Sequence, residues 1–401
     1  MSQTRTRKIL GALLAASLSS LLMAQSPAVE LKADDLAVVT WDGAYEDSQQ
    51  IAYFTPFTEK TGIPIATESY DGSLEAIKKI IAEKGAADVI DVSSGVLTKL
   101  CNEELLAPID VEKLPPAAGG NGNPDTSDPA TTASTSADAD FIDGGVSSCG
   151  VASVAWAATI VFDKETYGGK TPSKAADFFD PKAFPGKRAL PKGPRYTLEL
   201  ALLSDGVTPS DVYSTLATPE GLDRAFAALD KIRTDIVWWT KPATPLKLIR
   251  NGKAAMGIAY TGRIFRSAVE APSHIGIVWD GQVYDLDHWA IPKTSGRKKE
   301  AAEFISFASR PDRLAAHAAL TAYGPARKSA IPLVGAHPVV GVEMARFLPT
   351  APSHFETALH FDQGWWDEHG KAIEERFEAW RKGRSTASNR TETDGDDADA
   401  Q

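Results

Sequence analysis

LAVVTWDGAYEDSQQIAYFTPFTEKTGIPIATESYDGSLEAIKKIIAEKGAADVIDV occupies residues 36–92, and this stretch decides the fold. Short apolar runs with β-branched residues predict strands, and apolar residues repeating every three or four positions predict helices. The predicted segments, a strand followed by alternating helices and strands, are 36–40, 48–61, 63–68, 73–83 and 88–92. This order predicts an α/β fold with a parallel sheet and right-handed crossovers.

The rest of the chain shows the same alternation. Predicted strands are 151–162, 255–260 and 276–279, and predicted helices are 173–178, 197–203, 218–231, 298–308 and 368–381. Ser173 is the expected N-cap of its helix, and Thr218 with Pro219 fits an N-cap followed by proline at the first helical position.

Composition and charge exclude several classes of protein. The chain has 401 residues, of which 43% are hydrophobic and 24% charged, as in a soluble globular protein of two domains. Collagen, a membrane bundle and a wholly disordered chain are therefore excluded. The formal net charge of -11 makes nucleic acid an unexpected partner, because binding to phosphates needs a basic face.

Residues 1–28 have the pattern of a secretory signal peptide. Arg5, Arg7 and Lys8 precede an uncharged run from Ile9 to Met23, which is shorter than the roughly 20 residues of a membrane span. Small residues follow, with cleavage expected after Ala24 or Ala28. The sequence therefore predicts a periplasmic protein, with an uncleaved anchor as the alternative.

The chain has two cysteines, Cys101 and Cys149. An exported chain meets oxidising conditions, so we expect one disulfide, with two free thiols as the alternative. Closing a loop of this length stabilises the fold by roughly 4 kcal/mol. No CxxC spacing signals a zinc or redox site.

Two stretches have the composition of disordered segments. Residues 114–145, inside the expected disulfide loop, lack lysine and arginine and contain little that could pack. The acidic tail, 385–401, is the second. We expect the first to be a disordered insertion and the second a disordered C-terminus.

Several motifs together resemble one family. They are VTWDGAY at 39–45, YFTPF at 53–57, PGKR at 185–188, YTLE at 196–199, WDGQ at 279–282, DLDHW at 285–289 and YGP at 323–325. Over residues 36–384, omitting 114–145, the chain resembles extracellular solute-binding proteins of ABC importers. It is most similar to their spermidine/putrescine-binding branch.

The resemblance implies a two-lobed, type II periplasmic-binding-protein fold. The expected lobe one is 36–157 plus 262–315, and the expected lobe two is 158–261 plus 316–384. The ligand would bind between the lobes, which close by a hinge motion. The family implies a monomer that uses no cofactor and delivers a small-molecule ligand to an ABC permease in the inner membrane.

The carboxyl ends of the first and third strands carry candidate ligand-binding residues, since ligands of open α/β sheets bind there. Trp41, Asp42 and Tyr45 could hold an ammonium group by aromatic contact and charge. Alternatively, Trp41 belongs to the core and Asp42 caps the next helix. Ser93 and Ser94 could bind polar groups or form an ordinary N-cap.

Further aromatic and basic candidates come from the second half of the chain. Tyr260 ends a predicted strand, and Trp239 could stack on a ligand, although one of the adjacent pair Trp238 and Trp239 should be core. Where the family's polyamine binders place acidic residues in the second lobe, this chain reads KGPRY at 192–196, which includes Arg195 and Tyr196. Arg195 and Arg263 would suit a ligand carboxylate, unless they pair internally or point outward.

Asp285 and Asp287 alternate with Leu286, which places both carboxylates on one face of a strand. Two desolvated carboxylates suit an ammonium ligand. The other interpretations are a divalent-cation site, a glycosidase pair or a plain surface pair. No clustered oxygen-ligand loop supports a cation.

The leading hypothesis is a binding protein without enzymatic activity that captures an amine-bearing solute such as a polyamine. The alternative solute is zwitterionic or anionic: an amino acid derivative, a carboxylate or a phosphonate. A secreted hydrolase is disfavoured because the sequence has no GxSxG or HExxH motif. A sensor with the same fold is the third hypothesis.

Overall fold

A computed structural model describes residues 34–117, 137–270 and 274–383 of the chain. The expected signal peptide and acidic tail lie outside these residues. Among the described residues, no helix is long and apolar enough to cross a membrane.

The described strands form one mixed sheet in the order β2-β1-β3-β8-β4-β7-β5-β6, with β9 paired to β8. Their bounds are β1 (Leu36–Thr40), β2 (Ile65–Ser69), β3 (Val89–Ser93), β4 (Gly150–Asp163), β5 (Arg188–Pro191), β6 (Ile236–Trp239), β7 (Met256–Tyr260), β8 (Ile275–Ala290) and β9 (Leu359–His360). The predicted parallel pairing is confirmed for β1 with β2 and with β3. The central pairs β3–β8, β8–β4 and β4–β7 are antiparallel, so the prediction of a parallel sheet was incomplete.

The helices fill the intervals between the strands. Their bounds are α1 (Ala44–Gln49), α2 (Thr55–Thr61), α3 (Leu74–Ala82), α4 (Ser94–Asn102), α5 (Ala137–Asp140), α6 (Ala175–Phe178), α7 (Thr197–Ser204), α8 (Val212–Leu216), α9 (Pro219–Asp230), α10 (Thr244–Arg250), α11 (Thr261–Glu270), α12 (Lys298–Ala308), α13 (Pro311–Leu320), α14 (Pro352–Phe355) and α15 (Gln363–Arg381). A π-helical turn, η1 (Gln50–Phe54), joins α1 to α2, so the helix predicted there is continuous but not regular. Short 3₁₀ turns are η2 (Val111–Lys113), η3 (Pro209–Asp211), η4 (Arg233–Asp235), η5 (Lys328–Leu333) and η6 (Met344–Phe347).

Two residues, Thr218 and Ser173, were predicted to be helix N-caps. The Thr218 side chain accepts a hydrogen bond from the Gly221 amide and caps α9, as predicted. The prediction for Ser173 was wrong, because the N-cap of α6 is Lys174. Here the Asp177 carboxylate accepts hydrogen bonds from the amides of Ser173 and Lys174, so an acidic residue inside the helix satisfies the free amides.

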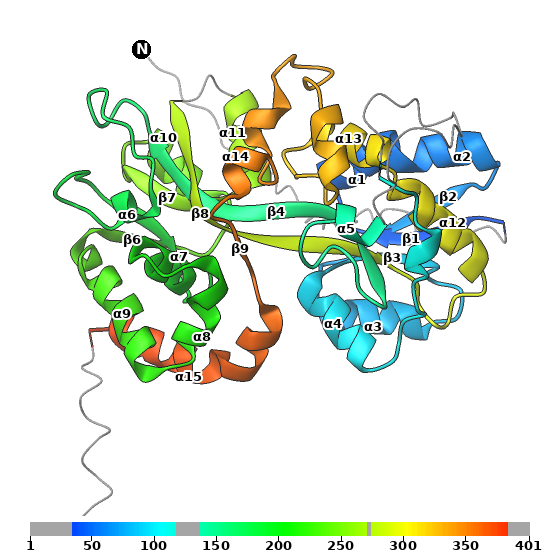
Figure 1. Cartoon of the computed structure of the whole chain (residues 1–401), viewed down its shortest axis with the longest axis horizontal. Helices are drawn as coiled ribbons and strands as arrows, with labels where there is room; N and C mark the ends of the chain where they lie inside the picture. The colour runs from blue at the N-terminus through cyan, green and yellow to red at the C-terminus, as the bar shows by residue number, and fades with distance from the viewer. Residues whose placement is uncertain (1–33, 118–136, 271–273, 384–401) are drawn as a thin grey trace, which may run out of the picture. The chain divides into compact units, whose positions relative to one another are not determined.

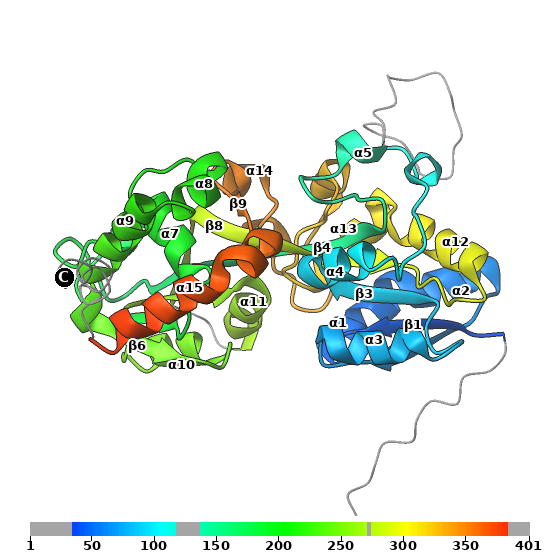
Figure 2. The ribbon, with the colours of Figure 1, turned by 90° about the horizontal axis from the view of Figure 1, so that it is seen from below.

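Two large hydrophobic cores lie toward opposite ends of β4 and β8 (Figure 1). The first core combines side chains of β1, β3, η1, α12 and α13 with the end of β8. The second combines α6, α7, α9, β7 and α15 with the other end of β8 (Figure 2). Because β4 and β8 contribute to both cores, the fold is two-lobed with these strands crossing between the lobes. The exact lobe boundaries stay a prediction.

The described ends of the expected insertion differ from that expectation. Leu114, Phe141 and Ile142 are buried in the first core. Asp140 and Arg327 form a buried ion pair with 2.7 Å between the carboxylate oxygen Oδ2 and Nε. Hydrophobic burial and this ion pair therefore order residues that composition alone placed in a disordered segment; residues 118–136 lie outside the described chain.

The predicted disulfide between Cys101 and Cys149 is confirmed. It joins α4 to the residue preceding β4, with the two Cα atoms 6.0 Å apart and a sequence separation of 48. The disulfide fixes α4 to the strand that crosses between the lobes.

Replacing Arg327 by alanine should destabilise the protein by about 3–5 kcal/mol, because Asp140 would keep a buried charge without a partner. Arg327 also donates hydrogen bonds to the carbonyls of Pro115 and Ser309, which would lose their donor. Urea unfolding of both proteins measures the difference.

The matched control is Arg224→Ala, which removes an exposed ion pair with Asp205. Exposed pairs contribute about 1 kcal/mol or less. Equal losses in the two variants would show that the buried pair does not hold this part of the fold.

Candidate functional site

Three aspartates, Asp91, Asp285 and Asp287, form what we call the acidic cluster. Asp287 pairs with Ser93 across the β3–β8 ladder, and alternation places Asp91 and Asp285 on the same face as Asp287. The side chains are 0%, 5% and 8% exposed, in the order given. Among the described residues, no lysine, arginine or histidine forms an ion pair with any of them.

Asp91 is held by hydrogen bonds from four neighbours. Donors to its carboxylate are the Tyr45 hydroxyl (2.9 Å), the Gln49 amide (2.7 Å), the Ser153 hydroxyl (3.0 Å) and, more distantly, the Thr40 hydroxyl (3.5 Å). Burial nevertheless raises the pKa of Asp91 to about 7, because the loss of water costs more than these bonds return.

Asp285 and Asp287 have fewer donors. The Asp285 carboxylate accepts the Leu286 amide at 2.7 Å, and burial raises its pKa to about 6. The pKa of Asp287 is raised far more strongly, first by burial and then by repulsion from Asp91 and Asp285. A hydrogen bond from Trp156 only partly opposes this. The cluster therefore favours an added positive charge.

Aromatic rings from the crossing strand β4 and from the second lobe lie beside the cluster. Trp156 pairs with Asp285 across β4 and β8, and its ring centroid lies 6.1 Å from Tyr196 and 5.7 Å from Tyr260. Tyr196 also packs on Phe361 at 4.7 Å. Tyr196 has a φ of 64°, a left-handed conformation that is unusual for a bulky residue and occurs preferentially at binding sites. These rings form an apolar wall of the site.

Tyr323 and Arg263 lie on another side of the cluster. The Tyr323 and Tyr45 ring centroids are 5.6 Å apart, and a Cβ at Gly262 would lie 2.7 Å from the Tyr323 hydroxyl. Burial raises the pKa of Tyr323 to about 12; Asp287 raises it further, whereas Arg263 lowers it. The exposed Arg263 side chain therefore brings positive charge to the edge of an acidic site.

The three candidates that follow the first strand lie in different surroundings. Tyr45 joins the cluster directly, and Trp41 reaches it through Tyr70: the two rings are 5.4 Å apart, and the Tyr70 hydroxyl donates to the Asp91 carbonyl. Asp42 is exposed and does not cap α1, whose N-cap is Gly43. Its role as a ligand contact stays a prediction.

Ser93 ends β3, and Ser94 begins α4 directly beside the cluster. The Ser94 hydroxyl donates to the Leu286 carbonyl at 3.0 Å, and a hydrogen bond from Ser94 opposes the rise in the Asp285 pKa. Both serines therefore stand at the point where β3 leaves the sheet. Their contact with a ligand stays a prediction.

Two second-lobe candidates have structural partners. Trp239 is 5% exposed and packs in a core with β5 and β7, so it touches the site only through Tyr260, 6.1 Å away. The Arg195 guanidinium donates to Gln363 at 3.2 Å and to Glu374 at 3.4 Å. Arg195 therefore faces α15 rather than the acidic cluster in this structure.

A cavity of about 660 Å³ borders Ser94, but Asp91, Asp285 and Asp287 do not line it. Its lining includes Ser94 and Gln363, together with polar and aromatic residues of both lobes: Thr98, Asp143, Pro209, Ser210, Tyr213, Tyr284, Ala358, Leu359, His360, Phe361, Asp362 and Gly364. Its size suits a small organic solute. Within the described ranges, no group of three or more histidine, cysteine or acidic side chains is arranged to hold a metal ion.

Sequence reasoning missed Asp91, Trp156, Tyr323 and Gln363. Asp91 lies inside DVIDV, where a charged residue in an otherwise apolar buried strand was an available signal. Trp156 is half-buried within an otherwise buried run of β4. Gln363 gave no signal, because its role depends on where α15 meets α4.

The two lobes and a polar site between aromatic and acidic walls are features of a solute-binding protein. The chain belongs to the bacterial extracellular solute-binding protein family, whose model matches residues 52–340. It is the substrate-binding component of an ABC transporter.

Two curated relatives are similar to this chain over most of its length. The chain is 36% identical over 359 residues to the gamma-aminobutyric acid-binding protein of Pseudomonas aeruginosa, covering 89% of this chain and 94% of the relative. It is 25% identical over 263 residues to the spermidine/putrescine-binding periplasmic protein of Escherichia coli, covering 64% and 68%.

Solved structures agree in fold. An ABC transporter substrate-binding protein from Bradyrhizobium japonicum has a TM-score of 0.69 and 27% identity, covering 86% of this chain and 99% of that one. The Atu4243-GABA receptor has a TM-score of 0.66 and 27% identity, covering 86% and 97%. The predicted type II periplasmic-binding-protein fold is therefore confirmed.

Asp285→Asn should gain stability relative to the parent protein as pH rises. Burial raises the folded-state pKa of Asp285 from 3.8 to about 6, so the folded parent keeps a proton that the unfolded chain has lost. The parent is therefore destabilised progressively from about pH 4, and the full difference of about 3 kcal/mol is reached above about pH 6. Urea unfolding across this range measures it.

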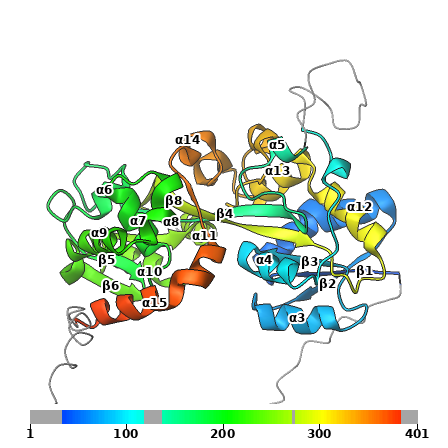
Figure 3. The same ribbon diagram turned by 60° about the horizontal axis from the view of Figure 1, so that its bottom comes forward.

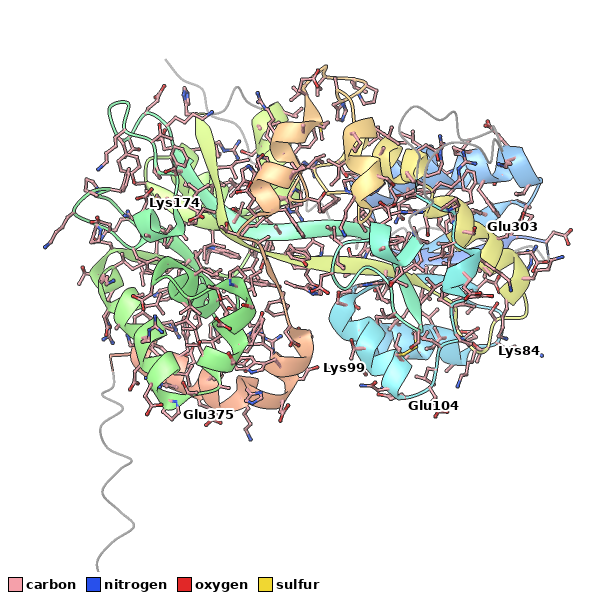
Figure 4. The ribbon with its side chains drawn as sticks, viewed as in Figure 1. Lys84, Lys99, Glu104, Lys174, Glu303 and Glu375 are labelled. Carbon is pink, nitrogen blue, oxygen red and sulfur yellow. A yellow bond between two sulfur atoms is a disulfide. The ribbon has the colours of Figure 1, made fainter. Side chains whose placement is uncertain are left out.

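Comparing each variant with the parent at the same pH removes the titration of other buried groups from the difference. Glu375→Gln on exposed α15 is the control that removes one acidic charge elsewhere (Figure 4). A difference in the free energy of unfolding between the parent and Asp285→Asn that does not change with pH would mean that Asp285 has the same pKa in the folded and unfolded chains.

Proposed function

We propose that this protein binds a small zwitterion in the periplasm, as a monomer, and delivers it to an inner-membrane ABC permease. The solute class is an amino acid whose ammonium and carboxylate are separated by a short apolar chain, as in γ-aminobutyric acid. The observation that carries the proposal is an acidic cluster without a cationic partner among the described residues, together with the exposed Arg263, which acts on the same Tyr323 hydroxyl as Asp287.

The ammonium end is assigned to the acidic cluster. Asp287 is the carboxylate that a positive charge would stabilise most, since burial and two neighbouring carboxylates all disfavour its ionised form. A bound ammonium would replace the missing counter-charge and donate hydrogen bonds to Asp285 and Asp287. Trp156 and Tyr260 would pack on the adjoining methylene groups.

The carboxylate end is assigned to Arg263. Its side chain is exposed at the start of α11, and it influences the Tyr323 hydroxyl, which Asp287 also influences. A guanidinium binds a carboxylate through two parallel hydrogen bonds and would repel a second ammonium group. This charge arrangement favours a zwitterion over a diamine.

The polyamine hypothesis, which the sequence favoured, has two supports: three carboxylates meet in one place, and a relative with 25% identity is named for binding spermidine and putrescine. The relative with 36% identity is named for γ-aminobutyric acid. We therefore place the zwitterion first and retain a diamine as the second candidate.

Calorimetric titration with γ-aminobutyrate, butylamine and butyrate separates the two ends of the ligand. Asp287→Asn should weaken γ-aminobutyrate and butylamine roughly 100-fold, because it removes a buried charge contact. Arg263→Gln should weaken γ-aminobutyrate and butyrate about tenfold and leave butylamine unchanged.

Glu375→Gln and Arg250→Gln remove the same charges from exposed positions of α15 and α10 and should bind as the parent does. Putrescine is the competing ligand. Binding of putrescine more tightly than γ-aminobutyrate, improved by Arg263→Gln, would overturn the zwitterion in favour of a diamine.

A further inference from the structure

Helices α4 and α15 come from different lobes and touch each other. α4 is fixed to β4 by the disulfide, and α15 buries Trp366, Ile373 and Phe377 in the second core. Figure 3 shows the start of α15 next to α4, and Figure 4 places Lys99 at this junction. The contact therefore joins the lobes away from the crossing strands.

Gly95 allows the helices to come this close. A Cβ at position 95 would lie 2.3 Å from Gln363 Cγ and 3.1 Å from Gln363 Cβ, too near for the present arrangement. Gly95 lies in regular helix and needs no left-handed backbone. Its lack of a side chain thus serves the approach of α15 rather than the conformation of α4.

Polar contacts continue from this close approach. Lys99 Nζ lies 3.0 Å from Asp367 Oδ2 across the junction. The Gln363 amide donates to Asp367 Oδ1 at 2.8 Å, and its oxygen accepts the Arg195 guanidinium at 3.2 Å. Arg195 directly precedes Tyr196, which forms part of the aromatic wall. The junction is thereby connected to the ligand site through the backbone between Arg195 and Tyr196.

We propose that Gly95, Lys99, Gln363 and Asp367 form a latch that stabilises the closed arrangement of the two lobes. Lobe closure in this fold class is a hinge motion, and separation of the lobes would part Lys99 from Asp367. The latch rests on the solute-binding role of the protein and does not depend on which solute is bound. By stabilising the closed arrangement it slows the release of ligand.

The latch has a second consequence for the site. When the lobes separate, Gln363 leaves Gly95, and the chain that holds Arg195 loses its contact with α4. Arg195 is then a positioning residue, because it acts on the ligand through the adjacent Tyr196. Closing the lobes and fixing the aromatic wall would be parts of one movement.

Spin labels at two exposed positions of opposite lobes, Lys84→Cys and Glu375→Cys, report closure without any ligand (Figure 4). Pulsed electron resonance gives the distribution of distances between them. Lys99→Ala and Asp367→Ala should each lower the closed-to-open ratio by up to about fivefold, the range of a partly exposed ion pair. The exchange Lys99→Asp with Asp367→Lys should restore it.

Gly95→Ala should shift the distribution toward open and leave the melting temperature equal or higher, because alanine favours the helix. Lys78→Ala is the matched control: its ion pair with Glu103 lies within one lobe, and closure should be unchanged. Unchanged distances in both Gly95→Ala and Lys99→Ala would overturn the latch, as would failure of the exchange to restore closure.

The same variants in a titration with γ-aminobutyrate should show faster dissociation, by the factor that closure changes. If γ-aminobutyrate does not bind at all, the distances still decide the latch, so failure of the proposed ligand and failure of the latch are separate outcomes.

Discussion

Burying carboxylates next to one another without a cation costs free energy, and this protein buries three carboxylates in one place. Asp91, Asp285 and Asp287 are almost entirely withdrawn from water, and repulsion from Asp91 and Asp285 makes ionisation of Asp287 harder. The protein supplies neutral donors to Asp91 but no counter-charge to the group among its described residues. The remaining attraction is for a positive charge from outside, and the proposed binding depends on it.

The rest of the fold serves to hold that cluster between two lobes. β8 has 16 residues, begins in the second core and ends in the first, and carries Asp285 and Asp287 at the crossing. β4 runs beside it and places Trp156 opposite Asp285. One lobe therefore provides the aspartates and their donors, and the other provides aromatic rings. The proposed solute would contact both sets of groups only when the lobes are close together, which would couple recognition to closure.

Much of this was predictable where information is local. The strands and helices of 36–92 follow from periodicity, and alternation alone put Asp285 and Asp287 on one face. The disulfide followed from a count of cysteines. The antiparallel pairing of the crossing strands did not follow from the sequence, because it depends on partners more than a hundred residues apart.

Long-range contacts also explain what was missed in the site. Asp91 looked like part of a core strand, and nothing near it in sequence revealed that Asp287 would face it. The partners of Arg195 on α15 lie 168 and 179 residues away. The sequence around Arg195 therefore did not indicate the direction that its side chain takes.

The most direct test is the number of protons released when γ-aminobutyrate binds, measured by calorimetry in buffers with different heats of ionisation. Near pH 6 the cluster is partly protonated, so a bound ammonium group should expel a substantial fraction of a proton. The release should be smaller at pH 8, because Asp91 and Asp285, whose pKa values are raised to about 7 and about 6, are largely ionised there. Binding with no proton release at either pH, or with proton uptake, would contradict the role given to the acidic cluster.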